Sequence, residues 1–236
     1  LVFDWFAEHL KLLEKVVTVY SMQGCDDEVL LLAFKFMLEL ADNSTNRLRF
    51  DTWSINGLIV FKEIASHLTN FFSCHDFLST TGKPVQADAY KERFKYLKRA
   101  TDITGRFVLG NYINFAMCEY YNDDSFSQLI NAVFRSLLNV DMKQLAGYSK
   151  LHRKILMFVE EFFKRHLELT FLKLDFELII AVVNQLLFPN LGDSEFAIKS
   201  NALLSLDSLN EFIFNNLRKP SKKRPELAQK VQQFYN

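Results

Sequence analysis

The sequence has few residues that break helices and few that form cross-links. Its 236 residues include 7 Gly, 4 Pro and 3 Cys. Because so few positions allow a sharp turn, the composition favours helices with short connections over many short strands. Cys25, Cys74 and Cys118 are odd in number and form no CxxC pair. This pattern excludes a disulfide framework and indicates a reducing compartment.

The sequence also has no excess of charge of either sign and no long hydrophobic run. Lys and Arg total 28, and Asp and Glu total 28, so no global basic field exists to drive DNA or RNA binding. The most apolar run, FELIIAVVNQLLF at 176–188, has 13 residues and contains Glu177. Since a membrane span needs roughly 20 apolar residues, we expect a buried helix here.

Apolar side chains at helical spacing are what the chain has in abundance. Hydrophobic residues make up 49% of it, and 24 are Phe, each with a large area to bury. Leu58, Phe61, Ala65, Leu68 and Phe72 step by three and four, which is typical of one helix face. No segment shows sustained strand alternation. The spacing predicts helices at about 2–20, 27–41, 55–73, 88–109, 125–139, 149–167, 175–187 and 194–217.

Acidic or hydroxyl residues precede several of these predicted helices. Asp26, Asp123 or Asp124, and Asp193 or Ser194 stand just before an apolar periodic run. Their side-chain oxygens can accept hydrogen bonds from the free amide groups of a first helical turn.

The spacing of the predicted helices indicates a repeat. Pairs that start near 2, 55, 125 and 175 are spaced roughly like HEAT-type units of about 40–50 residues. We therefore expect an all-α fold, an α-solenoid of about four antiparallel helix pairs over 1–217. A basic linker and the start of a further helix would occupy 218–236. A compact helix bundle is the alternative architecture. Because the chain starts without Met inside a periodic pattern, we expect a fragment of a longer solenoid.

Patterns that carry catalysis or bind a metal are missing from the sequence. It contains no P-loop, no GxGxxG, no HExxH and nothing like a nucleophile elbow. His67 and His75 lie near Cys74, but this spacing fits no standard zinc site. We expect a protein without catalytic residues, cofactor or metal.

An unusual charged cluster interrupts the connection between the second and third predicted helices. Arg47, Arg49 and Asp51 occur in NRLRFD, among large apolar residues. Arg is suited to bonding several carbonyls and acids at once. One interpretation is a clasp between adjacent repeats, and the other is direct contact with a partner.

Two basic segments are further candidates for partner binding. Lys91, Lys95 and Lys98 share one face of a predicted helix, which is either an ordinary exposed face or a strip that meets an acidic protein. The second segment, RKPSKKRPELAQK at 218–230, is either a solvated linker or a contact for an acidic partner. Its candidate residues are Lys222, Lys223 and Arg224.

Three stretches resemble the exportin-seven family of nuclear transport receptors, within the importin-β or karyopherin superfamily. They are residues 28–63 with their helix, arginine-bearing turn and helix, GNYINFAMCEYYNDDSFSQLI at 110–130, and RKPSKKRPELAQKVQQF at 218–234. The similarity runs through most of the chain and is weaker from about 140 to 200. Exportin-four-like receptors are the nearest alternative, and HDFLSTTGKPVQADAY at 75–90 departs from the family pattern.

The resemblance implies a fold, a function and partners. The fold would be HEAT repeats, and the matched region would lie in the C-terminal half of such a receptor. The whole receptor would carry protein cargo with Ran-GTP, contact phenylalanine-glycine nucleoporins, and shuttle between nucleus and cytoplasm. Two other functions remain open from the residues alone: a helical-repeat scaffold for vesicle traffic or complex assembly unrelated to Ran, or an all-α enzyme.

Overall fold

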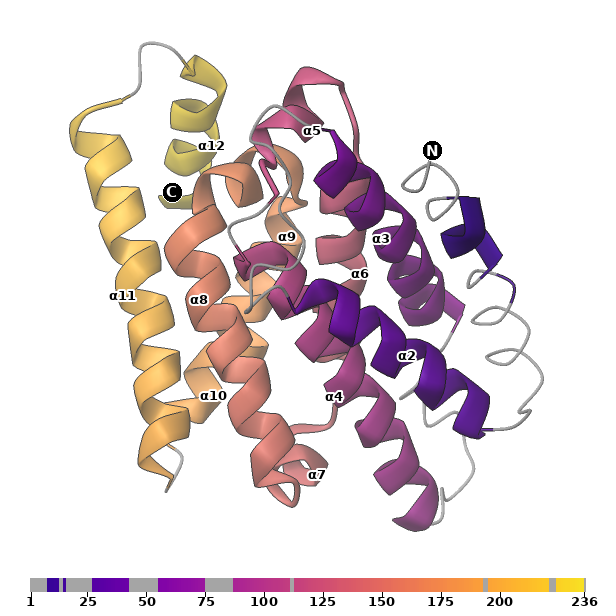
Figure 1. Ribbon diagram of the computed structural model, residues 1–236. Coiled ribbons are helices and arrows are strands. Elements are labelled where there is room, and N and C mark those ends of the chain that lie inside the picture. The colour runs from indigo at the N-terminus through magenta and orange to yellow at the C-terminus, as the bar shows by residue number, and fades with distance from the viewer. Residues whose placement is uncertain are drawn as a thin grey trace. The chain divides into compact units, whose positions relative to one another are not determined.

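The structure is a computed structural model that describes residues 8–12, 15, 27–42, 55–74, 87–110, 113–192, 195–220 and 224–235. Within these ranges the chain forms helices and turns and no strand, which confirms the all-α prediction (Figure 1). The helices are α2 (Asp27–Ala41), α3 (Asn56–Cys74), α4 (Ala87–Leu109), α5 (Ala116–Tyr120), α6 (Ser125–Leu138), α7 (Met142–Ala146), α8 (Ser149–Lys173), α9 (Phe176–Ala181), the π-helix η1 (Val182–Leu187), α10 (Phe188–Asn190), α11 (Phe196–Arg218) and α12 (Pro225–Tyr235).

One predicted helix end is wrong. The helix predicted at 149–167 continues to Lys173 as α8. Thr170 and Phe171 on this extra length are both 1% exposed. The ring centroid of Phe171 lies 5.2 Å from that of Phe212 and 5.3 Å from that of Phe234. The last turns of α8 are stabilised by contacts with residues far along the chain. The local sequence pattern, from which the helix end was predicted, gives no information about such contacts.

The apolar run at 176–188 forms a helix whose middle turn is widened. It comprises α9, the π-helix η1 and α10 in succession. Val182, Leu186 and Leu187 are at most 1% exposed, whereas Phe188 at the end of the run is 51% exposed, so this predicted helix is buried along one face only. No helix in the described ranges is both long and apolar enough to cross a membrane. Most of the helix predicted at 2–20 lies outside the described residues.

The chain divides into two compact units, Leu1–Asn139 and Val140–Asn236. In the first unit α2 packs on α4, two helices separated in sequence by α3. The ring of Phe34 lies 6.3 Å from that of Tyr96, and further along both helices Asp42 pairs with Arg106. Since both contacts advance in the same direction along both helices, α2 and α4 are parallel.

The same arrangement joins α3 to α6 in the first unit. Lys62 in the first half of α3 pairs with Asp123 just before α6. The ring of Phe115 bridges the two helices, 5.0 Å from Phe61 and 4.7 Å from Phe126. The first unit is therefore two layers of helices, α2 with α4 and α3 with α6.

The second unit repeats this parallel packing between α8 and α11. Arg153 near the start of α8 pairs with Glu195 before α11, and Phe171 near the end of α8 meets Phe212. Each contact joins residues roughly 40 apart, about the length of one HEAT unit. The widened helix α9–η1–α10 and the last helix α12 pack on this pair.

Within each unit, the parallel packing of α2 on α4, α3 on α6 and α8 on α11 distinguishes the two architectures considered above. Stacked antiparallel pairs place the second helix of one pair on the second helix of the next, as α2 does on α4 and α8 on α11. An up-and-down bundle would instead pack sequential neighbours antiparallel. The packing within each unit confirms a helical-repeat solenoid of HEAT type.

Candidate functional site

Several of the predicted site residues lie outside the described ranges. These are Arg47, Arg49 and Asp51 of the charged connection, and Lys222 and Lys223 of the basic linker. Lys91 belongs to α4, but its side chain is outside the described part of the structure. The clasp and partner-contact interpretations of these residues therefore both remain predictions.

The basic strip on α4 occupies the outward face of that helix. Lys95 and Arg99 are exposed and Lys98 is half-buried, while the opposite face holds the core residues Leu97 and Ala100. Asp102 also lies on the outward face, half-buried among the cations. The strip therefore has a local positive excess that is partly offset.

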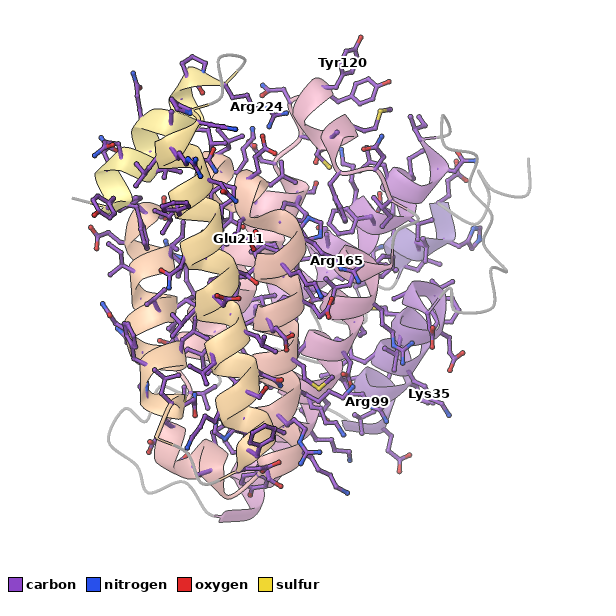
Figure 2. All side chains as sticks on the ribbon, turned by 90° about the vertical axis from the view of Figure 1, so that its left-hand side faces the viewer. Lys35, Arg99, Tyr120, Arg165, Glu211 and Arg224 are labelled. Atoms are coloured by element: carbon purple, nitrogen blue, oxygen red, sulfur yellow. The ribbon has the colours of Figure 1, made fainter. Side chains whose placement is uncertain are left out.

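Lys35 adds a cation from α2 that sequence reasoning did not include. It is exposed, and it follows Phe34, whose ring contacts Tyr96 of α4. Lys35 is thus held at the level of the α4 strip, and Figure 2 labels it together with Arg99. The signal in the sequence was a single lysine in the mainly apolar run VLLLAFKFMLEL, in which Glu39 is the other charged residue. We call Lys35, Lys95, Lys98 and Arg99 the α2–α4 basic surface.

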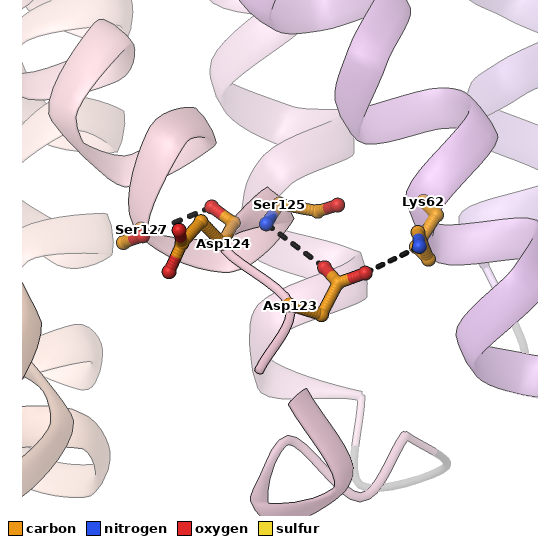
Figure 3. A network of polar contacts seen from close by, with 5 residues as sticks. All are labelled: Lys62, Asp123, Asp124, Ser125 and Ser127. Atoms are coloured by element: carbon orange, nitrogen blue, oxygen red, sulfur yellow. Dashed lines mark hydrogen bonds and ion pairs between the residues drawn. The ribbon is translucent and has the colours of Figure 1, made fainter. Parts of the chain in front are cut away.

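A network of polar contacts fixes the start of α6 on α3 (Figure 3). The carboxylate of Asp123 pairs with Lys62 and accepts a hydrogen bond of 2.9 Å from the amide of Ser125. The Ser127 hydroxyl donates to the carbonyl of Asp124 at 2.9 Å. Of the two aspartates predicted to cap this helix, Asp123 thus binds a free amide of the first turn. The predicted caps Asp26, Asp193 and Ser194 lie outside the described residues.

The charge state of Asp123 follows from these contacts. Burial raises the pKa of its carboxyl group, but the hydrogen bonds from Lys62 and Ser125 and the charge of Lys62 outweigh burial. The net effect is a pKa below the ordinary value of 3.8. Asp123 is therefore a stable anion that joins two helices, which suits a structural role and not proton transfer.

Two grooves run between stacked helices. The groove between α3 and α6 has a volume of about 290 Å³ and a polar lining that includes Ser66, Thr69 and Gln128. The groove between α8 and α11 has a volume of about 340 Å³. Phe163, Leu167 and Phe212 give the second groove apolar walls, and its polar lining is Lys164, Arg165, Glu168, Ser208, Glu211 and Asn215.

Arg224 was predicted to bind a partner protein, but in the structure it forms an ion pair with Glu168 of the same unit. Its guanidinium lies 3.1 Å from the carboxylate of Glu168, which lines the α8–α11 groove. Figure 2 labels Arg224 together with Arg165 and Glu211, which come from α8 and α11. Arg165 itself lies 3.2 Å from Glu161, one helical turn before it. Charged groups of both signs therefore surround this groove.

Two buried histidines, His67 and His152, have structural contacts. His67 Nε2 lies 3.2 Å from the backbone oxygen of Leu10. His152 Nε2 donates to Asn190 Oδ1 at 2.7 Å, and Asn190 in turn donates to the carbonyl of Leu186 at 2.6 Å. In the part of the chain that the structure describes, no three His, Cys, Asp or Glu residues gather as a metal site would require.

Comparison with known proteins gives distant relatives that cover nearly the whole chain. Exportin-7 of Dictyostelium discoideum is 25% identical over 219 residues, which are 93% of this chain and 21% of that protein. Ran-binding protein 17 of Homo sapiens is 24% identical over 225 residues, 94% of this chain and 20% of that protein. Exportin-7-B of Xenopus laevis is 23% identical over 226 residues, 95% of this chain and 20% of that protein.

The extent of these matches confirms the resemblance identified from the sequence. No family model and no solved structure matches the chain. The chain spans about a fifth of the length of the curated relatives it matches. It is a distant homologue of exportin-7 and Ran-binding protein 17, proteins of the exportin-7 family.

Proposed function

We propose that the chain is a protein-binding segment of a nuclear transport receptor that carries protein cargo through nuclear pores in a Ran-GTP-dependent way. The observation that carries this proposal is the homology to exportin-7 and Ran-binding protein 17 over 93–95% of the chain. The parallel stacking of α2 on α4 and of α8 on α11 supports it, because solenoids of this kind offer long surfaces to protein partners.

Such a receptor acts without catalytic residues. Each repeat contacts only its neighbours, so small changes at successive interfaces add up to a change of curvature along the array. Cargo and Ran-GTP that favour the same curvature help one another bind, and linkage makes this effect equal in both directions. The receptor would shuttle between nucleus and cytoplasm, releasing cargo when GTP is hydrolysed on Ran.

The α2–α4 basic surface is the candidate contact for an acidic cargo or for Ran. Lys95 and Arg99 are exposed there, and Lys35 adds charge from the neighbouring helix. Lys222 and Lys223 of the basic linker are a second candidate. Arg224 would join them only by exchanging Glu168 for a group on the partner, since Glu168 already lies 3.1 Å away.

The α8–α11 groove is the candidate contact for phenylalanine-glycine nucleoporins. A phenylalanine ring needs an apolar slot, and Phe163, Leu167 and Phe212 supply apolar walls between two stacked helices. The polar groups around the groove are mostly charged, so they would remain hydrated while a ring enters.

The test is a pull-down of the full-length receptor with Ran loaded with GTP or with GDP. We expect retention of Ran-GTP, stronger in the presence of cargo, and much weaker retention of Ran-GDP. Binding that ignores the nucleotide, or no binding, would reject the transport proposal and favour a helical-repeat scaffold unrelated to Ran. The full-length receptor is needed because this chain spans only about a fifth of its relatives.

A further inference from the structure

Two tyrosines stand exposed at the end of α5, the short helix between α4 and α6. Tyr120 and Tyr121 are 80% and 56% exposed. Their ring centroids lie 5.1 Å apart, with an angle of 88° between the ring planes, and Figure 2 shows Tyr120 pointing away from the helices. Tyr is enriched where protein segments bind one another, because its large and stiff side chain gains much contact for little lost freedom.

The tyrosines belong to a turn that is fixed to α3 on both sides. On one side the ring of Phe115 packs against Phe61 with 5.0 Å between centroids, and on the other Asp123 pairs with Lys62. Within the turn, the amide of Asp123 donates to the carbonyl of Cys118 at 2.7 Å. The two rings are therefore held toward solvent by a turn with defined contacts.

The turn has an excess of negative charge. From 107 to 134 the sequence contains three acids, Glu119, Asp123 and Asp124, and no Lys or Arg. Lys62 of α3 offsets Asp123, which leaves two acids in this stretch against no cation of its own. A guanidinium group suits such a surface, because it can lie on a Tyr ring and pair with a carboxylate at the same time.

The connection between α2 and α3, residues 43–54, begins and ends beside the same part of α3. It begins after Asp42, which pairs with the α4 residue that precedes Phe107, and the Phe107 ring lies 6.1 Å from that of Phe61. It ends at Ile55, about 9 Å along α3 from Phe61. Since a segment of this length can reach about 40 Å when extended, the connection is long enough to contact the α5 turn.

We propose that Arg47 and Arg49 bind the α5 turn, with their guanidinium groups against the rings of Tyr120 and Tyr121 and within reach of its carboxylates. The two arginines stand in the middle of 43–54, outside the described residues, and supply the positive charge that suits the turn. The contact would join the connections before and after the α3–α4 pair and so hold this pair in place. The inference does not depend on the proposed transport function.

The test is hydroxyl-radical footprinting of the full-length protein, read at Tyr120 and Tyr121 by mass spectrometry. In Arg47→Gln combined with Arg49→Gln, both tyrosines should be modified about threefold faster than in wild type, because the rings lose the groups that cover them. The rate at Tyr235, a tyrosine of the second unit, should not change and reports that the variant is folded. Unchanged rates at Tyr120 and Tyr121 would overturn the proposal.

The matched control combines Arg135→Gln with Arg218→Gln, two exposed arginines of α6 and α11, and it removes the same charge. Both tyrosines should keep their wild-type rates in this control. Equal acceleration in the two double variants would assign the effect to net charge, and acceleration of wild type on dilution would assign the contact to a second copy of the chain. Either result would overturn the proposal.

Trypsin cleavage gives the reciprocal measurement from the side of the arginines. Tyr120→Ala combined with Tyr121→Ala should speed cleavage after Arg47 and Arg49 about threefold, because each guanidinium must leave the turn before it can enter the protease. Tyr235→Ala, a change of the same kind in α12, should leave cleavage there at the wild-type rate. If removal of the two rings leaves cleavage after Arg47 and Arg49 unchanged, the arginines do not bind this turn.

Discussion

At the scale of single residues, Asp123 connects two helices of the first unit. It sits one position before the N-cap of α6 and neutralises part of the positive end of that helix while pairing with Lys62 of α3. Its side chain is 11% exposed, whereas that of Lys62 is 47% exposed. The carboxylate is therefore the desolvated member of the pair, and its loss should cost more than loss of the lysine.

We predict that Asp123→Asn lowers the free energy of unfolding by about 1–3 kcal/mol, because hydrogen bonds to a charged group are lost. Since the folded-state pKa is depressed, the contribution is complete well above 3.8 and disappears as the pH falls through the lower folded-state pKa. Urea unfolding at neutral pH and at about pH 3 measures the free energy of unfolding of both proteins. The difference in this free energy between wild type and Asp123→Asn should shrink at the acidic pH.

Asp124→Asn is the matched control for this prediction. Asp124 is the neighbouring carboxylate and is exposed, and its side chain makes no capping hydrogen bond to α6. Its replacement should cost less than that of Asp123 at neutral pH. Equal losses for the two variants would show that general charge at the helix start matters, and not the pairing of Asp123 with Lys62.

At the scale of elements, one buried hydrogen-bond chain ties the widened helix to α8. His152 of α8 is 2% exposed and Asn190 of α10 is 5% exposed. Asn190 accepts from His152 and donates to Leu186, the carbonyl of which belongs to η1. This side-chain bond ties the widened turn to the segment that follows it and, through His152, to α8.

We predict that Asn190→Ala destabilises the second unit by about 1–3 kcal/mol, because it leaves the buried His152 donor unsatisfied. Asn184→Ala is the control: Asn184 is an exposed residue of η1, and its replacement should cost less than about 0.5 kcal/mol. Hydrogen exchange should show faster opening of 182–190 in Asn190→Ala. Exchange that is unchanged there would mean that apolar packing alone holds the widened turn.

At the scale of the whole molecule, the absence of net charge makes local placement of charge decisive. Lysines and arginines number the same as acids, so long-range attraction to a charged partner is small. Any contact with an acidic surface must come from a local excess such as the α2–α4 basic surface. Screening by salt should then reveal which lysines take part.

We predict that Lys95→Glu combined with Lys98→Glu weakens binding of an acidic partner of the receptor by about tenfold, or about 1.4 kcal/mol. The salt dependence of binding should fall as well, because fewer charge pairs remain to be screened. The control combines Lys11→Glu with Lys150→Glu, two exposed lysines that belong to neither α2 nor α4, and it changes net charge by the same amount. Binding would be measured by calorimetry over a salt series. If the two double variants weakened binding equally, the α2–α4 basic surface would not be the contact.

Part of this helical structure can be predicted from the amino-acid sequence. Apolar residues that recur every three or four positions predicted α2, α3, α4 and α6 to within a residue or two, because amphipathic spacing is a local property. The end of α8 was missed because Phe171 is buried by Phe212 and Phe234, residues far along the chain. The short helices α5 and α7, five residues each, are too short for a periodic signal.

The amino-acid sequence by itself determined that this protein is all-helical, that its helices recur in pairs, and that it is related to the exportin-7 family. These properties follow from local spacing and from residue order. The tertiary structure alone decided that α2 stacks parallel to α4, α3 to α6 and α8 to α11 within their units, that Lys35 lies near the strip on α4, and that Asp123 pairs with Lys62. Each of these depends on residues separated by tens of positions, which only packing in space brings together.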